Sequence, residues 1–353
     1  MSTIHHTNKE SIKALSKTLY DGDRQAVQAT LGNLLMPEAV CHFSHPLGDV
    51  TGAGLYEEIF VPIFSAFPDL ERRDVILISG SDQEGQDWVG CAGHYAGRFM
   101  APFFGIPPTG HIADIRFHEY YRFVDAQIVE IQAIWDLPGL MMQAGVWPMA
   151  PSLGRDGYVP GPASQDGLAQ AGFETAKTAA NLQHVLDMLE SMQRYPSQGG
   201  ADIMELDKFW HPHFNWYGPS GIGSCRGVDG FRTWHQTPFL NAMPDRGQHP
   251  QETEAHFFAE GDYVAVTGWP NMAQTLTGDG WLGMAPIDKK ITLRSLDFWR
   301  LEGGLIRENW VLVDLLDIWA QIGVNVMARM AELGSARPGY GSPVYQGASD
   351  EQT

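Results

Sequence analysis

The sequence has few cysteines, little basic charge and no long apolar run, and each scarcity excludes a class of protein. The chain has 353 residues and only three cysteines, Cys41, Cys91 and Cys225, with no C-x-x-C pair. This spacing argues against a disulfide scaffold or a thiolate metal site and fits a reducing cytoplasm. Lysine and arginine number 23 against 42 acidic residues, giving a net charge of −19. Such a charge repels nucleic-acid phosphates and anionic membranes.

Membrane and secretion signals are also missing from the sequence. No stretch approaches the ~20 apolar residues of a membrane span, and the first twenty residues lack the apolar core of a signal peptide. We therefore expect a cytoplasmic protein without a nucleic-acid or membrane partner. Apolar residues make up 44% of the chain, which is enough for ordinary globular cores.

Two segments of the chain repeat one another without gaps. Residues 121–146 and 299–324 are identical at eight of 26 positions. The pairs are Arg122/Arg300, Ile128/Ile306, Glu130/Glu308, Asp136/Asp314, Leu137/Leu315, Gln143/Gln321, Gly145/Gly323 and Val146/Val324. Upstream, FSAFPD at 64–69 answers FLNAMPD at 239–245 if one residue is inserted. The sequence therefore predicts a tandem duplication of one unit.

Stretches rich in proline, glycine and serine predict where the units end. One such stretch follows Trp147, and another follows Leu333. We predict a first copy at 1–150, a linker at 151–172, a second copy at 173–333 and a poorly ordered tail at 334–353.

Within each copy, helical patterns precede strands. In the first copy, helices are predicted over 11–20, 24–35 and 54–67, followed by strands joined through short turns. This order indicates an α+β fold in which helices pack on one face of a curved antiparallel sheet.

The strands place acidic residues among apolar ones on a single face. Stepping in twos along one strand gives Ile115, Phe117, Glu119, Tyr121 and Phe123, and in the second copy Leu293, Ser295, Asp297, Trp299 and Leu301. The next strand gives Ile128, Glu130, Gln132, Ile134 and Asp136, and in the second copy Ile306, Glu308, Trp310, Leu312 and Asp314. A plain core face would not carry acids, because burying an unpaired carboxylate is costly.

Two interpretations of these acids stay open. The acids can be structural, pairing with arginines or backbone donors, and Asp136 and Asp314 can cap the helices that follow them. Alternatively, a carboxyl group inside an apolar cavity has a raised pKa and exchanges protons near neutral pH.

The segment 103–146 carries a family resemblance. It combines a GIPPTG loop before a long strand, YRF followed by a turn and IVE, and an Asp ahead of a GLM-x-Q-x-G helix. These features resemble the SnoaL-like polyketide cyclases, which share the cone-shaped α+β barrel of nuclear-transport-factor-2-like proteins. The resemblance covers most of 8–150 and, less closely, 176–330. It implies two such barrels, and the duplication suggests that they form an internal pseudo-dimer.

The resemblance also implies an activity. Family members that cyclise polyketides perform an intramolecular aldol condensation without metal or organic cofactor, using one Asp as general acid/base. The matching positions here are Asp136 and Asp314, which we take as candidate catalytic residues. Supporting pocket residues are predicted to be Glu119, Glu130, Gln132, Tyr121, Asp297, Glu308, Trp299 and Trp310.

The chain departs from the family pattern in both copies. Where the family tends to have EHW, the first copy has EIQ at 130–132 and the second has ENW at 308–310. The second copy also has GMAPID in place of GIPPTG. One copy could therefore be a structural partner only.

We accordingly expect a cofactor-independent acid/base enzyme of the lyase or isomerase type, acting on a hydrophobic carbonyl compound. The alternative is a non-catalytic protein that binds a small hydrophobic ligand in the same cavity, and a homodimer of the fused chain stays open.

The histidines raise the question of a metal site. A metal site built from His211 and His213, or from His42 and His45, would need a third ligand such as His94 or His235. Polar residues at a pocket or its rim are the simpler interpretation of these histidines.

Overall fold

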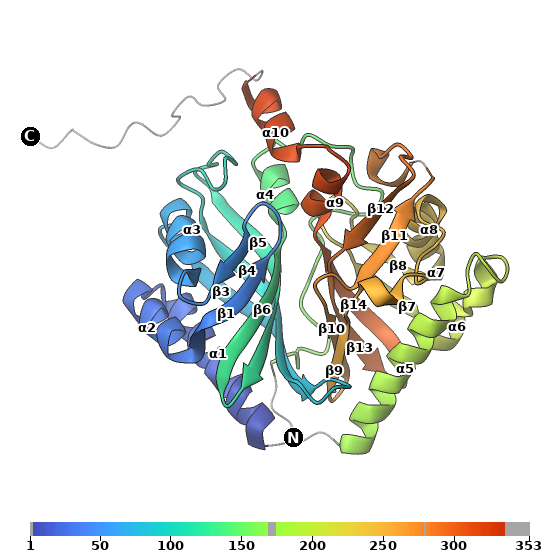
Figure 1. The fold of residues 1–353 in the computed structure, drawn as a ribbon, viewed down its shortest axis with the longest axis horizontal. Helices are drawn as coiled ribbons and strands as arrows, with labels where there is room; N and C mark the ends of the chain where they lie inside the picture. The colour runs from blue at the N-terminus through green and yellow to red at the C-terminus, as the bar shows by residue number, and fades with distance from the viewer. Residues whose placement is uncertain (1–2, 169–173, 279, 336–353) are drawn as a thin grey trace, which may run out of the picture.

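The protein consists of two α+β units whose sheets face each other, with helices on the outside (Figure 1). The structure is a computed structural model and describes residues 3–168, 174–278 and 280–335. Residues 169–172 of the predicted linker and 336–353 of the predicted tail lie outside this range. No helix within the described ranges is long and apolar enough to span a membrane.

The first unit begins with two helices and ends with a run of four long strands. Its elements are α1 (Thr3–Asp21), α2 (Arg24–Leu34), β1 (Leu35–Phe43), β2 (Gly48–Thr51), the π-helical turn η1 (Tyr56–Phe60), α3 (Val61–Ala66), β3 (Glu71–Ser81), β4 (Asp87–Arg98), β5 (Ile112–Val124), β6 (Gln127–Trp135) and α4 (Leu137–Gln143). The strands form one sheet in the order β2-β1-β6-β5-β4-β3.

The second unit repeats this plan with interrupted strands. Its helices are α5 (Thr175–Gln193), η2 (Ala201–Met204), α6 (Leu206–Phe209), α7 (Gly227–Phe231), η3 (Arg232–Gln236), α8 (Thr237–Ala242), η4 (Pro250–Glu252), η5 (Trp281–Gly283), α9 (Leu315–Gln321) and α10 (Val326–Ser335). Its strands are β7 (Trp210–Tyr217), β8 (Cys225–Arg226), β9 (His256–Glu260), β10 (Tyr263–Thr267), β11 (Met272–Leu276), β12 (Lys289–Leu293), β13 (Ser295–Glu302) and β14 (Leu305–Val313). The sheet order is β8-β7-β14-β13-β10-β9, and β11 and β12 form a separate hairpin.

Each sheet is mixed, which corrects the expectation of a purely antiparallel one. β1 runs parallel to β6, and β7 runs parallel to β14, whereas the other pairs are antiparallel. The reason lies in the connection: η1 and α3 carry the chain from β2 at one edge of the sheet to β3 at the other. The antiparallel run from β3 to β6 then brings its last strand alongside β1 in the same direction.

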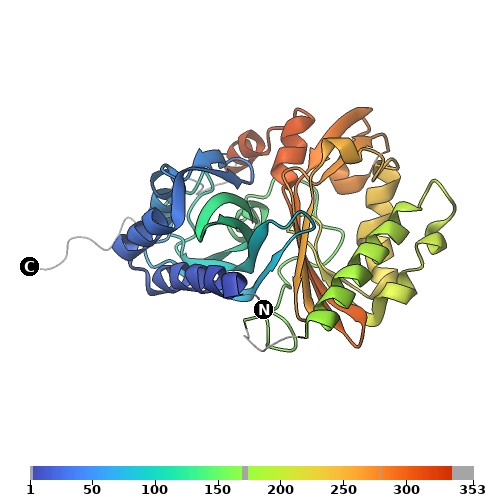
Figure 2. The same ribbon diagram turned by 60° about the horizontal axis from the view of Figure 1, so that its bottom comes forward.

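The outer face of each sheet is buried against the other unit. The shared apolar layer consists of Ile76, Ile78, Trp88, Ala92, Tyr120 and Ile134 from the first unit with Tyr217, Phe258, Tyr263, Ala265, Leu296, Phe298, Trp310 and Leu312 from the second. Figure 2 shows the two sheets meeting in this layer, with α1 and α5 on opposite outer sides. The predicted internal pseudo-dimer is therefore confirmed.

Polar contacts tie the two units together at the edges of this layer. The Lys9 ammonium in α1 pairs with the Glu260 carboxylate in β9 at 2.8 Å, and both side chains are buried. The described part of the predicted linker also runs between the units: the Leu77 N–H donates to the carbonyl of Gly167, and the Ala163 N–H donates to the Glu308 carboxylate. Both polar and apolar contacts thus fix the relative position of the units.

Candidate active site

The second unit encloses a cavity of about 100 Å³ between its sheet and helices α5, α7 and α8. The aromatic part of its wall comprises Trp210, Trp216, Phe231, Phe239, Trp281 and Trp299. A second lobe of about 250 Å³ adjoins it and shares Leu189, Arg246, Met272, Ser295, Asp297 and Trp299 with the first. A small, mostly apolar space with a few polar groups is the usual form of a ligand site.

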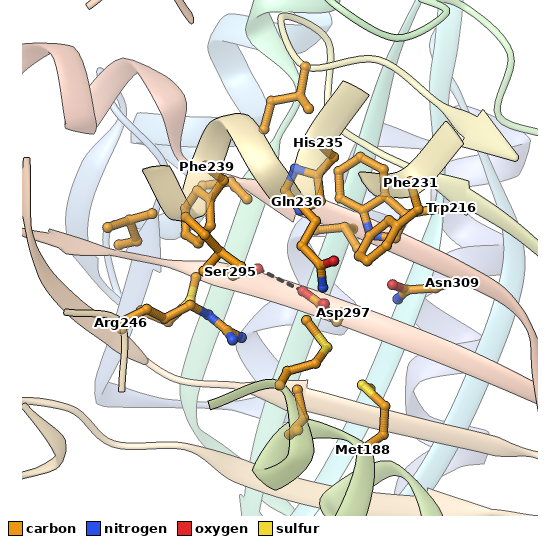
Figure 3. A pocket seen from close by; sticks show the side chains of 18 of the residues that line it. Met188, Trp216, Phe231, His235, Gln236, Phe239, Arg246, Ser295, Asp297 and Asn309 are labelled. Atoms are coloured by element: carbon orange, nitrogen blue, oxygen red, sulfur yellow. Dashed lines mark hydrogen bonds between the residues drawn. The ribbon is translucent and has the colours of Figure 1, made fainter. Parts of the chain in front are cut away.

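Asp297 is the carboxyl group of this cavity (Figure 3). It lies on β13 and points into the space, and its accessible surface faces the two lobes. The Ser295 hydroxyl donates a hydrogen bond to its Oδ1 atom at 2.7 Å. Burial raises the pKa of Asp297 to about 7, although Ser295, Arg246 and Asn309 all favour the ionised form. The group can therefore both take and give a proton near neutral pH.

Two polar side chains from the π-helical turn η3, His235 and Gln236, line the same cavity. The His235 ring stacks on the Trp216 ring with centroids 3.9 Å apart, and its Nδ1 atom is buried without a partner among the described residues. Burial, and secondarily Arg246, lowers the pKa of His235 to about 3, so the imidazole is neutral at physiological pH. The Gln236 side chain follows it, with both amide atoms buried and unpartnered within the described residues.

More hydrogen-bond donors without partners surround the same space. They are Nη1 of Arg246 and the indole N–H groups of Trp210, Trp281 and Trp299, counted against the described residues only. Native proteins pair nearly all buried polar atoms, because an unpaired one costs about 1–3 kcal/mol. Several such atoms around one cavity indicate that their partners come from a bound molecule or from water.

The interior of the first unit is filled by a network of side chains at the corresponding place. The Glu119 carboxylate, which corresponds to Asp297, pairs with the Arg72 guanidinium at 2.6 Å. It also accepts hydrogen bonds from the side chains of Tyr95, Tyr121 and Trp135. Its hydrogen-bonding capacity is thus used within the protein.

The two units thus differ in the residues that would face a ligand. The segments η1–α3 and η3–α8 have equal length, so their residues can be paired one to one. This pairing places three polar residues of the second unit opposite three apolar residues of the first: His235 opposite Ile59, Gln236 opposite Phe60, and Arg246 opposite Leu70. The polar cavity belongs to the second unit.

The order of elements, seen twice, agrees with a comparison against known families. Residues 15–144 and 191–322 each match the SnoaL-like polyketide cyclase family. The chain belongs to this family. Both units are therefore SnoaL-like, including the first, whose interior is filled.

Solved structures similar to this chain, among them a putative hydroxylase and a putative polyketide cyclase, cover about two fifths of it. AclR of Streptomyces galilaeus is 20% identical, covering 42% of this chain and 86% of its own, with a TM-score of 0.35. IdmH of Streptomyces antibioticus is 23% identical over 39% of this chain and 98% of its own, with a TM-score of 0.34. An NTF2-like protein of Burkholderia thailandensis is 15% identical over 39% and 96%, with a TM-score of 0.31. Comparison with curated proteins gave no match.

The two aspartates that the resemblance selects, Asp136 and Asp314, lie at the contact between the SnoaL-like units. Asp136 caps α4 by accepting from the Gly139 N–H, and it also accepts from the N–H and hydroxyl of Ser220 in the second unit. Asp314 caps α9 through the Asp317 N–H and accepts from the His45 N–H of the first unit. The capping role is confirmed for both, and neither lines the cavity around Asp297.

Both aspartates are nevertheless buried, and burial is the main cause of a raised pKa in each. The pKa of Asp136 is raised against the effect of Arg116 and Ser220. The pKa of Asp314 is raised to about 6 against the effect of Arg294, whose guanidinium lies 3.1 Å from the carboxylate. Their predicted catalytic role stays a prediction, whereas their bridging role is visible in the contacts.

A β-bulge explains why the predicted face of the last strand was wrong. The register of β5 against β6 shifts between Arg122 and Phe123, and that of β13 against β14 shifts between Arg300 and Leu301. Ile128 and Ile306 point into their units, but beyond each bulge the inward residues are 131, 133 and 135, or 309, 311 and 313. An extra residue in one strand reverses which alternate residues face inward.

The remaining predicted pocket residues of these strands therefore face the other unit. Glu130 pairs with Arg122, and Glu308 pairs with Arg300 at 2.6 Å. Gln132 donates to Glu130 and accepts from the Thr267 hydroxyl of the second unit. The Trp310 indole donates to the Pro160 carbonyl. Of the predicted pocket residues, Asp297 and Trp299 line the cavity, and Glu119 and Tyr121 occupy the filled interior of the first unit.

Sequence reasoning missed Gln236 and Arg246, and it considered His235 only as a metal ligand. A signal for all three exists in the repeat itself. Aligning 56–70 with 232–246 without the inserted residue pairs Pro68 with Pro244 and places polar residues opposite Ile59, Phe60 and Leu70. At these positions one copy has a buried apolar residue and the other has a polar one. Such a difference indicates that the copy with the polar residues contains the polar cavity.

The histidines considered as metal ligands do not gather in one place. His211 and His213 lie side by side on β7 with ring centroids 5.8 Å apart, whereas His235 lies in the cavity. Across the described ranges, no cluster of three or more His, Cys, Asp or Glu side chains is arranged to hold a metal ion.

Proposed function

We propose that the second unit binds a hydrophobic carbonyl compound and catalyses proton transfer on it, with Asp297 as the general acid/base. The observation that carries this proposal is a carboxyl group with a pKa of about 7 in a largely apolar cavity, surrounded by buried donors that lack partners within the described part of the chain. A strongly shifted pKa in a cavity is a common mark of an acid/base site. Membership of the SnoaL-like polyketide cyclase family supports the same reaction class.

The chemistry follows from the positions of these groups. The Asp297 carboxylate would remove a proton from the carbon next to a carbonyl, and the C–H electron pair would move into the new C=C bond. The carbonyl oxygen would become an oxyanion, and the Gln236 amide and the Trp299 indole N–H are donors available to stabilise it.

The protonated Asp297 can then complete the reaction in one of two ways. Returning the proton to a different carbon gives an isomerisation. If the enolate carbon attacks a second carbonyl of the same molecule, a C–C bond forms and the resulting alkoxide takes the proton, which completes an aldol cyclisation. Both routes use only side chains of the cavity and consume no other reactant.

A non-catalytic binding protein is the second candidate function. The aromatic wall would hold a flat apolar ligand equally well without any proton transfer, because ring stacking and burial supply the affinity. The experiment below separates the two candidates.

Deuterium exchange tests the proposal without knowledge of the natural substrate. 2-Tetralone, a bicyclic ketone with acidic C–H groups beside its carbonyl, would be incubated with the protein in D₂O and followed by NMR. We expect protein-dependent exchange that increases with pH through about 7, because the ionised carboxylate is the base. Asp297→Asn should abolish it while leaving binding of the ketone intact, and Asp314→Asn serves as the control. Binding without exchange in the wild type would establish the binding protein instead.

A further inference from the structure

Arg246 places a half-buried cation between the two lobes of the cavity. It lines both lobes together with Asp297, and its guanidinium points toward that carboxyl group in Figure 3. Its Nη1 atom is buried and makes no hydrogen bond within the described residues. No salt bridge to Asp297 is formed among the described contacts, although each group shifts the pKa of the other.

The buried arginines among the described residues each meet acidic or carbonyl acceptors. Arg72 pairs with Asp74 and Glu119, although its Nη2 atom has no partner there, and Arg300 pairs with Glu302 and Glu308. Arg116 donates to the backbone carbonyls of 217, 218 and 311. Arg246 has no such ion pair or carbonyl acceptor within the described residues, so an anion bound in the cavity would supply a partner for its buried Nη1 atom.

Within the two lobes, the surroundings of Arg246 favour an anion in spite of the acidic chain, whereas Asp187 and Glu190 line a separate outer hollow that Arg246 also borders. The sequence has 42 acidic residues, yet the described residues that line the two lobes include a single carboxyl group, Asp297. That group is half-protonated near pH 7, because burial raises its pKa to about 7. An anion beside Arg246 therefore meets little repulsion when Asp297 carries its proton.

We propose that the natural ligand of this cavity carries a carboxylate on a flat apolar body, and that Arg246 binds the carboxylate at the junction of the lobes. The aromatic wall around Trp216 and Phe231 would take the rings, and a ligand that reaches from this wall to Arg246 would pass Asp297, which Figure 3 shows between them. Guanidinium groups bind carboxylates through paired, charge-assisted hydrogen bonds, which gives orientation as well as affinity. This inference rests on the proposed function, because it names the substrate class of the same cavity.

Matched probes test the inference by calorimetry. 2-Naphthoate and 2-naphthamide share one ring system and differ in charge at the group that would meet Arg246. We expect the wild type to bind 2-naphthoate about tenfold or more tightly than the amide. Arg246→Gln should remove that preference while still binding the amide, and Arg246→Lys should keep part of it.

The contrary results are equally specific. Equal or tighter binding of the amide by the wild type, or a carboxylate preference that survives in Arg246→Gln, would overturn the inference. A second measurement concerns the protein without ligand: Arg246→Met should melt at or above the wild-type temperature, because it removes a guanidinium whose buried Nη1 atom has no partner among the described residues. A fall of about 5 °C or more would show that Arg246 has a structural partner and would overturn the inference as well.

Failure of the inference can be told apart from failure of the proposed function. Exchange of the neutral ketone 2-tetralone depends on Asp297 and needs no carboxylate on the ligand. Exchange without a carboxylate preference would leave the proposed function standing and overturn only the role of Arg246. A carboxylate preference without exchange would leave the role of Arg246 standing and overturn the proposed function.

Discussion

At the scale of single residues, the two units show how neighbours decide what a buried carboxyl group does. Glu119 and Asp297 occupy corresponding positions on β5 and β13, but Glu119 meets a guanidinium and three further donors. The Asp297 carboxyl group meets no guanidinium at ion-pair distance among the described residues and accepts a short hydrogen bond from the Ser295 hydroxyl. Glu119 is thus held by donors of its own unit, whereas burial raises the pKa of Asp297 to about 7 and leaves its proton exchangeable.

The raised pKa of Asp297 predicts how stability changes with pH. Because this pKa is about 7 in the folded chain and 3.8 for an ordinary Asp, folding takes up a proton between these values, and the free energy of unfolding falls as pH rises through them. The Asp297→Asn side chain does not ionise, so the variant does not lose stability in this way as pH rises. We compare the free energy of unfolding of the variant with that of the wild type at two pH values. The difference in favour of the variant should be larger at about pH 8 than at about pH 4, by on the order of 2–4 kcal/mol. Denaturant unfolding at both pH values measures the difference, and a pH-independent difference would contradict a buried titrating group.

The network in the first unit predicts that the stability of the protein depends on the cation beside Glu119. Arg72→Met leaves the buried Glu119 without its cation, which should cost about 3–5 kcal/mol. Arg73→Met is the matched control at the next position, because Arg73 is exposed and its ion pair with Glu71 lies at the surface. Chemical denaturation of both variants should show a large loss for the first and almost none for the second; equal, small losses would contradict a structural role for the network.

At the scale of elements, helices α4 and α9 begin at the aspartates that bridge the units. Replacing Asp136 or Asp314 by Ala removes an N-cap worth about 1 kcal/mol together with contacts to the other unit, so each variant should lose about 1–3 kcal/mol. Exchange of 2-tetralone should persist in both, measured well below their melting temperatures. Loss of exchange in these variants and its retention in Asp297→Asn would show that the cavity around Asp297 is not the acid/base site.

The elements also show which parts of the fold the sequence could predict. Helical periodicity, turn residues and the repeat predicted the α+β order and the pairing of two units. The face of β5 and β13 was predicted correctly because alternation holds along those segments, with Glu119 and Asp297 inward. The face of β6 and β14 was predicted wrongly. A one-residue bulge has no clear signature in the sequence, and the bulge moves every side chain beyond it to the opposite face of the sheet.

At the scale of the whole molecule, the first unit supports the site of the second. The Tyr120 hydroxyl on β5 donates to the backbone carbonyl of Asp297 at 2.7 Å, and a ring nitrogen of His118 lies 2.7 Å from the carbonyl oxygen of Leu296. The corresponding residues of β13, Phe298 and Leu296, have no polar side-chain atom with which to return these contacts. The sequence could not predict such contacts, because they depend on how two units meet in three dimensions.

This asymmetry predicts an effect of the first unit on the chemistry of the second. Tyr120→Phe removes one hydrogen bond to the strand that carries Asp297. We expect a loss of about 1 kcal/mol in stability and a clear fall in the exchange rate. Tyr217→Phe is the control, since its hydroxyl bonds Glu308 within the same layer and should affect stability alone. Equal exchange rates in the two variants would argue against positioning by the first unit.

The claim that joins all three scales is that Asp297 is a buried carboxyl group able to exchange a proton near neutral pH. Titration of the protein labelled with ¹³C at the aspartate carboxyl carbons, with Asp297→Asn used to assign the signal, measures this pKa directly. The account predicts a value of about 7. A value at or below the ordinary 3.8 would mean that Arg246 or another group holds the carboxylate ionised, and it would contradict an acid/base role for this cavity.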